Sequence, residues 1–223
     1  MHQSTILYIH GMGGGGDSRI PSILSGALSA RGVRTVVRTY SFHPEEGAAQ
    51  IASWVEELQP DLVVGESLGA NQAACIRGVP HIFVSPSFGA PLYFGNLAFL
   101  SFIPGMTRLL DRIYRPKEGD RQVLHFTYAN MHPYLSLRKK ALVNAPRCGG
   151  RDTFFAFFGR HDHYRKWGVV SVRTYRKYFG DTYEIYDGTH FMEEEFIYSL
   201  LIPKILETLG LAGTATASGQ DKP

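Results

Sequence analysis

The sequence predicts a three-layer α/β/α sandwich built around a mostly parallel central sheet. Short β-rich apolar runs alternate along the chain with longer segments of helical spacing, which is typical of parallel strands covered by helices on both faces. The 223 residues, 44% of them hydrophobic, suffice for one such domain with a sizeable core. We therefore expect a single domain over residues 1–210, followed by a small and polar flexible tail at 211–223.

Six apolar runs predict the strands. The first, TILYIH, is rich in β-branched and aromatic residues and ends at glycines, as a buried strand does. The run DLVVG and the run HIFVS have the same character. The expected strands are residues 5–10, 33–40, 61–65, 81–85, 153–158 and 182–186.

The segments between these runs predict helices, because their apolar residues recur every three or four positions. In the first of them, Ile20, Leu24 and Leu28 would share one helix face. The segment after DLVVG is instead rich in small residues. The expected helices are residues 19–31, 44–58, 68–77, 134–143, 167–179 and 192–209.

Residues 86–121 break the β–α rhythm and are interpreted as a possible cap-like insertion, in a chain that has no obvious long lid. The segment ends in a run of basic residues, Arg108, Arg112, Arg115, Lys117 and Arg121. Its apolar residues could roof an apolar pocket or could simply pack the segment onto the domain, and the sequence leaves both readings open. These residues are Phe88, Leu92, Tyr93, Phe94, Phe99, Leu100 and Phe102.

Composition excludes several classes of protein. A net charge of +3 without a stripe of Lys and Arg argues against a nucleic-acid partner. Cys75 and Cys148 lie far apart, so we expect neither a disulfide framework nor a cysteine metal site. No secretory signal pattern is present, and the longest apolar stretch, 96–106, is too short for stable membrane insertion. We expect a cytoplasmic protein.

A serine between two glycines follows the strand DLVV, in the stretch VVGESLGAN. A nucleophile elbow needs a sharp strand-to-helix turn with small residues around the serine, which Gly65 and Gly69 provide for Ser67. The helix that begins there would direct its positive end towards a developing anion. The alternative is a strand–helix turn in which the serine has no catalytic part.

Serine needs a base, and the base needs an acid that orients it. Asp162 follows the strand TFFAFF, and His190 follows the strand TYEIY, so both leave the sheet edge that Ser67 leaves. Asp187, three residues before His190, is a second candidate for the orienting acid. A turn role beside Gly188 is more typical of such an aspartate, which favours Asp162.

The stretches HGM, GESLG, GRHD and GTH, in this order, resemble the motifs of the α/β-hydrolase family over about residues 4–210, and the short chain resembles its compact bacterial (YqiA-like) esterases. This resemblance implies the α/β-hydrolase fold with Ser67 as nucleophile, His190 as general base and Asp162 as the acid that orients it. It also implies an oxyanion hole made by the backbone N–H groups of Met12 and Leu68. The implied reaction is hydrolysis of a small-molecule carboxylic ester or thioester, with no cofactor.

Three other functions compete with this one. An acyltransferase or a non-catalytic binding protein could use the same scaffold. The stretch HGMGGGG also fits G-x-G-x-x-G at Gly11, Gly13 and Gly16, so an NADP-dependent oxidoreductase is a remote alternative. The second strand does not end in the acid that a dinucleotide site needs, which favours an oxyanion loop. The adjacent residues His161, Asp162 and His163 do not have metal-site spacing, so we expect no metal.

Overall fold

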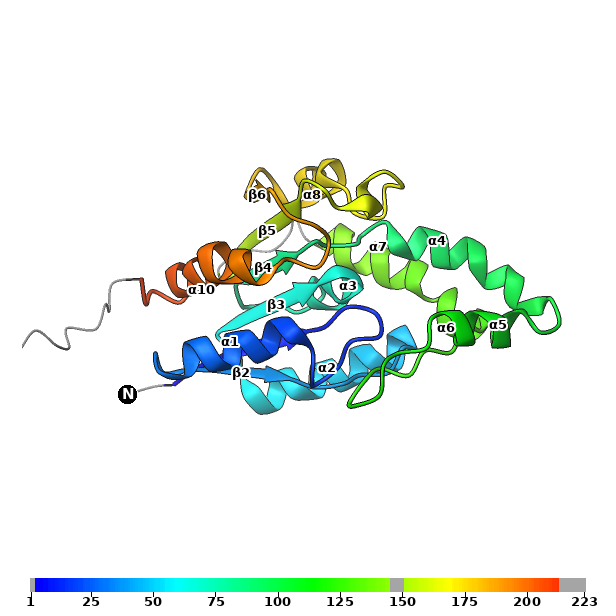
Figure 1. Ribbon diagram of the computed structural model, residues 1–223, viewed down its shortest axis with the longest axis horizontal. Coiled ribbons are helices and arrows are strands. Elements are labelled where there is room, and N and C mark those ends of the chain that lie inside the picture. Colours follow the sequence, from blue (N-terminus) through cyan, green and yellow to red (C-terminus); the bar gives the residue numbers. More distant parts are fainter. Residues whose placement is uncertain (1–2, 145–150, 213–223) are drawn as a thin grey trace, which may run out of the picture.

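The computed structural model describes residues 3–144 and 151–212, and its centre is a six-stranded sheet (Figure 1). The order is β2-β1-β3-β4-β5-β6, and every neighbouring pair is parallel. The predicted parallel sheet is therefore confirmed. Cys148 and most of the predicted flexible tail lie outside the described residues. The strands are β1 (Ser4–Ile9), β2 (Val33–Val37), β3 (Leu62–Glu66), β4 (His81–Val84), β5 (Phe154–Gly159) and β6 (Tyr183–Tyr186).

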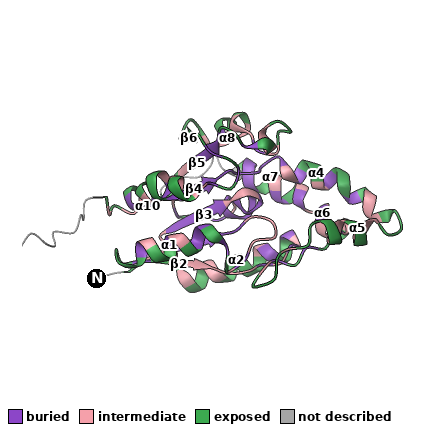
Figure 2. Ribbon diagram, in the orientation of Figure 1, coloured by how far each residue is buried: buried purple, intermediate pink, exposed green. Residues whose placement is uncertain are grey.

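Helices cover both faces of the sheet, with their buried sides against it (Figure 2). The α-helices are α1 (Arg19–Ser29), α2 (Pro44–Leu58), α3 (Ala70–Ala73), α4 (Ala90–Leu97), α5 (Met106–Ile113), α6 (Tyr128–Met131), α7 (Tyr134–Asn144), α8 (Val172–Phe179), α9 (Glu194–Phe196) and α10 (Ile202–Thr208). Shorter helical turns are η1 (Ser67–Gly69), η2 (Ala98–Phe102), η4 (His163–Arg165) and the π-turn η5 (Ile197–Leu201).

Alternate residues of each strand point to opposite faces, and this alternation builds the two cores. In β1, Leu7 and Ile9 pack in the cluster that α2, α3, α7 and α8 cover. Ile6 and Tyr8 pack in the other cluster, which α1, η5 and α10 cover. The result is the three-layer arrangement that the sequence predicts.

Three predicted helices differ from the observed ones. The helix expected at 68–77 is reduced to η1 and α3. The helix expected at 167–179 begins only at Val172, because the Ser171 hydroxyl accepts the Thr174 N–H at 3.1 Å and caps it. The helix expected at 192–209 is divided into α9, η5 and α10. Pro203, which lacks an N–H, stands in the first turn of α10 and interrupts the regular hydrogen bonding there.

The insertion after β4 forms α4, η2 and α5, which make up one end of the molecule (Figure 1). Its predicted aromatic residues divide into distinct groups. Phe88 belongs to the core of the domain, and Phe94 packs on Phe42 and Tyr134. Other members, including Phe102, are exposed. Only some of the aromatic residues of this segment therefore pack onto the domain.

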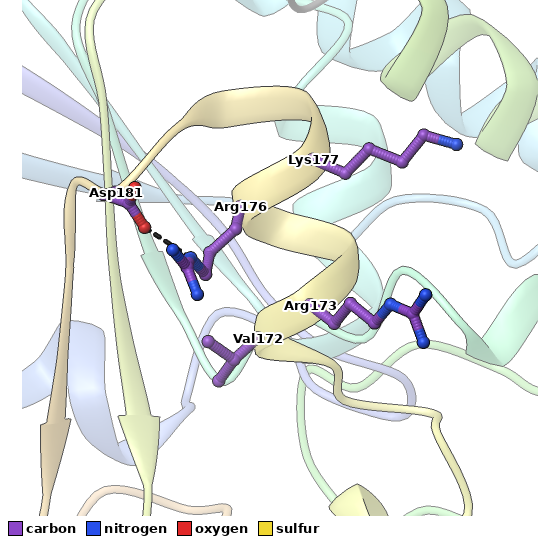
Figure 3. A pocket seen from close by; sticks show the side chains of 5 residues that line it. All are labelled: Val172, Arg173, Arg176, Lys177 and Asp181. Carbon is purple, nitrogen blue, oxygen red and sulfur yellow. Dashed lines mark hydrogen bonds and ion pairs between the residues drawn. The ribbon is translucent and has the colours of Figure 1, made fainter.

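An open pocket borders α8 on the outside of the molecule (Figure 3). Arg176 forms an ion pair with Asp181 there, whereas the side chains of Arg173 and Lys177 extend away from it. The lining residues are Val172, Arg173, Arg176, Lys177 and Asp181. Among the residues that the structure describes, no helix is long and apolar enough to span a bilayer.

Candidate active site

The candidate site lies at the carboxyl edge of the sheet, where loops from five strands meet. Ser67 comes directly after β3, and Ser87 lies three residues beyond β4. Asp162 and His190 follow β5 and β6, and the glycine-rich loop, residues 10–16 (HGMGGGG), follows β1. All these strands run in the same direction, so their loops leave the sheet on one side.

Ser67 occupies a sharp turn between β3 and η1. Its φ of +48° lies in the left-handed region, which non-glycine residues rarely adopt. A side chain at Gly69 would overlap the carbonyl oxygen of His10, so glycine is needed where the turn passes the first strand. A sharp, strained strand-to-helix turn at a serine is the backbone geometry that a nucleophile elbow requires.

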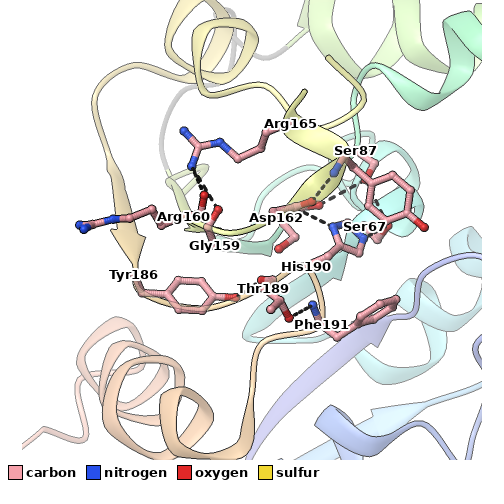
Figure 4. A network of polar contacts seen from close by, with 12 residues as sticks. Ser67, Ser87, Gly159, Arg160, Asp162, Arg165, Tyr186, Thr189, His190 and Phe191 are labelled. Carbon is pink, nitrogen blue, oxygen red and sulfur yellow. Dashed lines mark hydrogen bonds and ion pairs between the residues drawn. The ribbon is translucent and has the colours of Figure 1, made fainter. Parts of the chain in front are cut away.

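Ser67, His190 and Asp162 form a continuous line of polar contacts (Figure 4). The Oγ of Ser67 lies 2.9 Å from Nε2 of His190, and Nδ1 of His190 lies 2.7 Å from Oδ2 of Asp162. The Asp162 side chain is fully buried, and its Oδ1 accepts the N–H of Tyr164 at 2.8 Å. The Tyr164 ring packs edge-on against the imidazole, with ring centroids 4.7 Å apart. Both oxygens of the carboxylate are therefore engaged, and the imidazole is held in place.

Asp187, the second candidate for the orienting acid, lies in a different environment. Its carboxylate is 3.0 Å from Nε2 of His161 and 3.9 Å from Nε of Arg160. The side chain is 70% exposed. An exposed pair of this kind is screened by water and contributes little to holding a ring. The structure thus brings Asp162, and not Asp187, to His190.

The glycine-rich loop passes close to Ser67. A Cβ on Gly11 would lie 3.1 Å from that of Ser67. Within the described residues, the N–H of Met12 has no hydrogen-bond partner. The N–H of Leu68 lies in the first turn of η1, where the helix itself offers no acceptor. These are the two N–H groups that the sequence analysis assigns to an oxyanion hole.

The N–H groups of the four consecutive glycines, residues 13–16, are all bonded within the protein. Gly13 donates to Oε1 of Gln122 at 3.2 Å, Gly14 to the carbonyl of Gly11 at 3.0 Å, Gly15 to Oγ of Ser18 at 2.9 Å and Gly16 to Oγ1 of Thr39 at 3.3 Å. A dinucleotide turn needs such groups free for the pyrophosphate. The Asp120 side chain also lies where a Cβ of Gly16 would be, and its charge would repel phosphate. Both observations argue against a nucleotide site.

A strap formed by residues 120–122 holds the glycine-rich loop from outside, a contact that sequence reasoning missed. The buried Gln122 side chain accepts from the Gly13 N–H and donates to the Tyr40 carbonyl at 3.1 Å. Its backbone N–H donates to the Gly14 carbonyl at 2.7 Å. A side chain at Gly15 would overlap the Asp120 carbonyl, which explains that glycine.

Ser87 is a second polar residue that sequence reasoning missed. Its Oγ lies 3.1 Å from Oγ of Ser67, and its N–H donates to the Ser67 carbonyl at 3.0 Å. The Nδ2 of Asn71 donates to the carbonyls of Leu68 and Ser87. The position of Ser87 just beyond β4, at the edge that holds the other residues, is the signal that could have found it.

His10 supports the start of the glycine-rich loop. Its ring is fully buried, stacks on Tyr40 and has Nδ1 2.7 Å from the carbonyl of Gly11. Burial lowers the pKa of His10 to about 4, so the ring is neutral at neutral pH. Among the described residues, no three His, Cys, Asp or Glu side chains gather closely enough to hold a metal ion.

Solved structures share this architecture at low sequence identity, whereas no protein-family model and no curated protein sequence matches the chain. A carboxylesterase structure from Nitrososphaera gargenis is 13% identical, with a TM-score of 0.55, and the match covers 93% of this chain and 92% of that one. Est1E from Butyrivibrio proteoclasticus, with ferulic acid bound, is 16% identical, with a TM-score of 0.56 and coverages of 93% and 90%. Tomato methylketone synthase I is 8% identical, with a TM-score of 0.63 and coverages of 93% and 99%. The chain therefore has the α/β-hydrolase fold.

Proposed function

We propose that the protein is a serine hydrolase that cleaves a carboxylic ester or thioester through an acyl-enzyme on Ser67. The observation that carries the proposal is the line of contacts from Ser67 through His190 to the buried carboxylate of Asp162, at 2.9 and 2.7 Å. A serine hydroxyl becomes a useful nucleophile only when a base takes its proton, and this arrangement supplies the base and its orienting acid.

The reaction follows in two halves. The Ser67 oxygen attacks the carbonyl carbon while Nε2 of His190 takes the hydroxyl proton, and the carbonyl electron pair moves to oxygen. The N–H groups of Met12 and Leu68 stabilise this oxyanion. Collapse re-forms the carbonyl and expels the alkoxide or thiolate, which takes the proton from His190. Water then attacks the acyl-enzyme, again with His190 as base, and releases the acid and Ser67.

The surroundings of the proposed oxyanion hole favour an apolar acyl group. Met12 and Leu68 both belong to, or pack against, an apolar cluster that includes Phe42, Leu124 and Phe126. Ligand sites of this kind combine an apolar lining with a few polar groups. The carboxylesterase and ferulic-acid-binding relatives in fold are consistent with an ester substrate.

Stopped-flow hydrolysis of p-nitrophenyl esters and acyl thioesters of graded chain length tests the proposal. We expect a burst of one product per active site followed by steady turnover, and loss of both in Ser67→Ala. A burst that turns over only after an alcohol or amine is added would indicate an acyltransferase instead. No burst and no Ser67-dependent turnover across the whole panel would argue against acyl chemistry.

A further inference from the structure

The insertion after β4 exposes an unusual number of large apolar side chains. Phe102 is 68% exposed and Ile113 is 61% exposed. Of the fifteen large hydrophobic residues exposed in the described part of the chain, nine fall between positions 92 and 114. They are Leu92, Tyr93, Leu97, Phe99, Phe102, Ile103, Leu109, Ile113 and Tyr114, and we call these nine residues the apolar tip.

The apolar tip lies on the part of the insertion that projects away from the sheet. The turn that joins η2 to α5 is the outermost point of that end of the molecule, away from the sheet (Figure 1). The helices there are exposed along much of their length (Figure 2). Their inner side is already used, since Phe94 and Ala98 pack on the cluster around Phe42. Apolar surface concentrated on a projection of this kind typically marks a contact site.

Basic side chains are interleaved with the apolar ones. On α5, Arg108 and Arg112 are exposed and each precedes an exposed apolar residue, Leu109 and Ile113 respectively. Arg115 and Lys117 continue the series and are also exposed. The only acid within α5 is Asp111, which binds Nδ1 of His125 and the Phe126 N–H. Between positions 92 and 118 the only other acid is Glu118, which is exposed, and the exposed Asp120 follows it.

We propose that the apolar tip and its basic residues dock the protein on an anionic lipid surface. Phe102 and Ile103 at the turn would enter the boundary between head groups and acyl chains. Arg108 and Arg112 would reach the lipid phosphates, since arginine can bury its methylene stem while keeping its charge among the head groups. The apolar and the electrostatic contributions both favour binding, because each basic residue near an anionic membrane adds attraction to it. The protein would lie on the membrane and not span it.

The basic residues favour an anionic lipid surface over a second copy of the chain as the partner of the apolar tip. A symmetric contact between two tips would bring the arginines of one copy close to those of the other, and like charges at an interface oppose binding. An anionic lipid surface instead complements both the apolar and the basic part. The inference goes beyond the proposed hydrolysis and does not depend on it, so an inactive Ser67→Ala protein should bind equally well.

Co-sedimentation with lipid vesicles tests the proposal. The full chain should sediment with phosphatidylcholine vesicles that contain phosphatidylglycerol, and much less with phosphatidylcholine alone. Two double variants, Phe102→Ser with Ile103→Ser and Arg108→Glu with Arg112→Glu, should each weaken binding roughly tenfold or more. All four side chains are exposed, so both variants should keep the fold, which circular dichroism checks.

Matched controls change the same properties elsewhere. Arg173→Glu with Lys177→Glu alters the net charge equally on α8 (Figure 3), and Tyr198→Ser removes an exposed aromatic residue from η5. Both should bind like the wild type. Equal loss in the controls would mean that total charge or stability controls binding, which overturns the proposal. Failure of the wild-type chain to sediment with anionic vesicles also overturns the proposal. In that case, a dimer that light scattering detects and that Phe102→Ser disrupts would identify a second copy of the chain as the partner instead.

Discussion

Replacing Asp162 with asparagine should lower catalysis severely, because the amide cannot accept hydrogen bonds from both partners of the carboxylate. The carboxylate accepts at both oxygens, from the Tyr164 N–H and at Nδ1 of His190. An asparagine has only one accepting oxygen. If that oxygen keeps the Tyr164 N–H, the amide NH₂ faces Nδ1, which must then carry a lone pair. The ring proton moves to Nε2, where it prevents His190 from accepting the proton of Ser67.

The opposite orientation of the amide keeps the useful tautomer but directs the NH₂ at the Tyr164 N–H. That partly buried donor would lose its acceptor and face the NH₂ group, which costs about 1 kcal/mol of stability. We therefore expect the first orientation to dominate. The same tautomer error in trypsin-like serine proteases lowers kcat by about 10⁴, and a loss of this order is expected here.

The assay is the kcat for p-nitrophenyl acetate, measured beside thermal unfolding to exclude a folding defect. Asp187→Asn is the matched control, because its carboxylate is exposed and pairs only with exposed groups. It should change kcat less than about threefold. If Asp187→Asn were the damaging change and Asp162→Asn the mild one, the assignment of the orienting acid would be wrong.

Three further predictions concern other parts of the site and the core. Ser67→Ala and His190→Ala should each abolish turnover, and the double variant should be no slower than either, because the two residues act as a unit; a much slower double variant would contradict this. Gln122→Leu should lower kcat by up to about 10²-fold with little change in KM, since it frees the loop that carries one of the two proposed oxyanion donors; a KM effect alone would contradict it. Burial lowers the pKa of His81 from 6.5 to about 4, so the unfolded chain binds an extra proton between these values and stability falls as the pH falls. From pH 8 to pH 5, protonation of this histidine in the unfolded chain should lower the free energy of unfolding by about 2 kcal/mol. Urea titrations at both pH values should show that this decrease is absent in His81→Phe.

The sheet and the order of its motifs could be predicted because each depends on local pattern. A buried parallel strand needs a short continuous apolar run, and six such runs stand out in the chain. Since parallel strands end at one edge, the loops that carry Ser67, Asp162 and His190 could be placed together without knowing the sheet order.

The helix boundaries were harder to predict, because caps and missing donors decide them. Apolar spacing continues through Trp167, yet the Ser171 cap fixes the start of α8 at Val172. Spacing likewise suggests one long final helix, whereas Pro203 divides its hydrogen bonding. Pattern alone reports which face is apolar and not where a regular helix stops.

The strap could not be predicted at all. Gln122 and Gly13 are 109 positions apart, and nothing in the stretch around Gln122 indicates that it meets the glycine-rich loop. For the same reason, the sequence left a dinucleotide turn at Gly11, Gly13 and Gly16 open as a remote alternative to an oxyanion loop. The small size of the loop's glycines instead allows the Asp120 backbone to pack against Gly15, a tertiary contact without a local signature.

Fold alone does not decide the chemistry of this site. Tomato methylketone synthase I, which was solved with β-ketoheptanoate, matches this chain over nearly its whole length, as the esterases do. The proposed reaction therefore depends on the residues at the edge of the sheet and on their geometry.

The most direct test of the central claim is the site at which a fluorophosphonate probe reacts. Intact-protein mass spectrometry should show one adduct per chain, and peptide mapping should place it on Ser67. Labelling should be lost in Ser67→Ala and strongly slowed in His190→Ala. A stoichiometric adduct on another residue, or none on a folded wild-type protein, would contradict the account of Ser67 as an activated nucleophile.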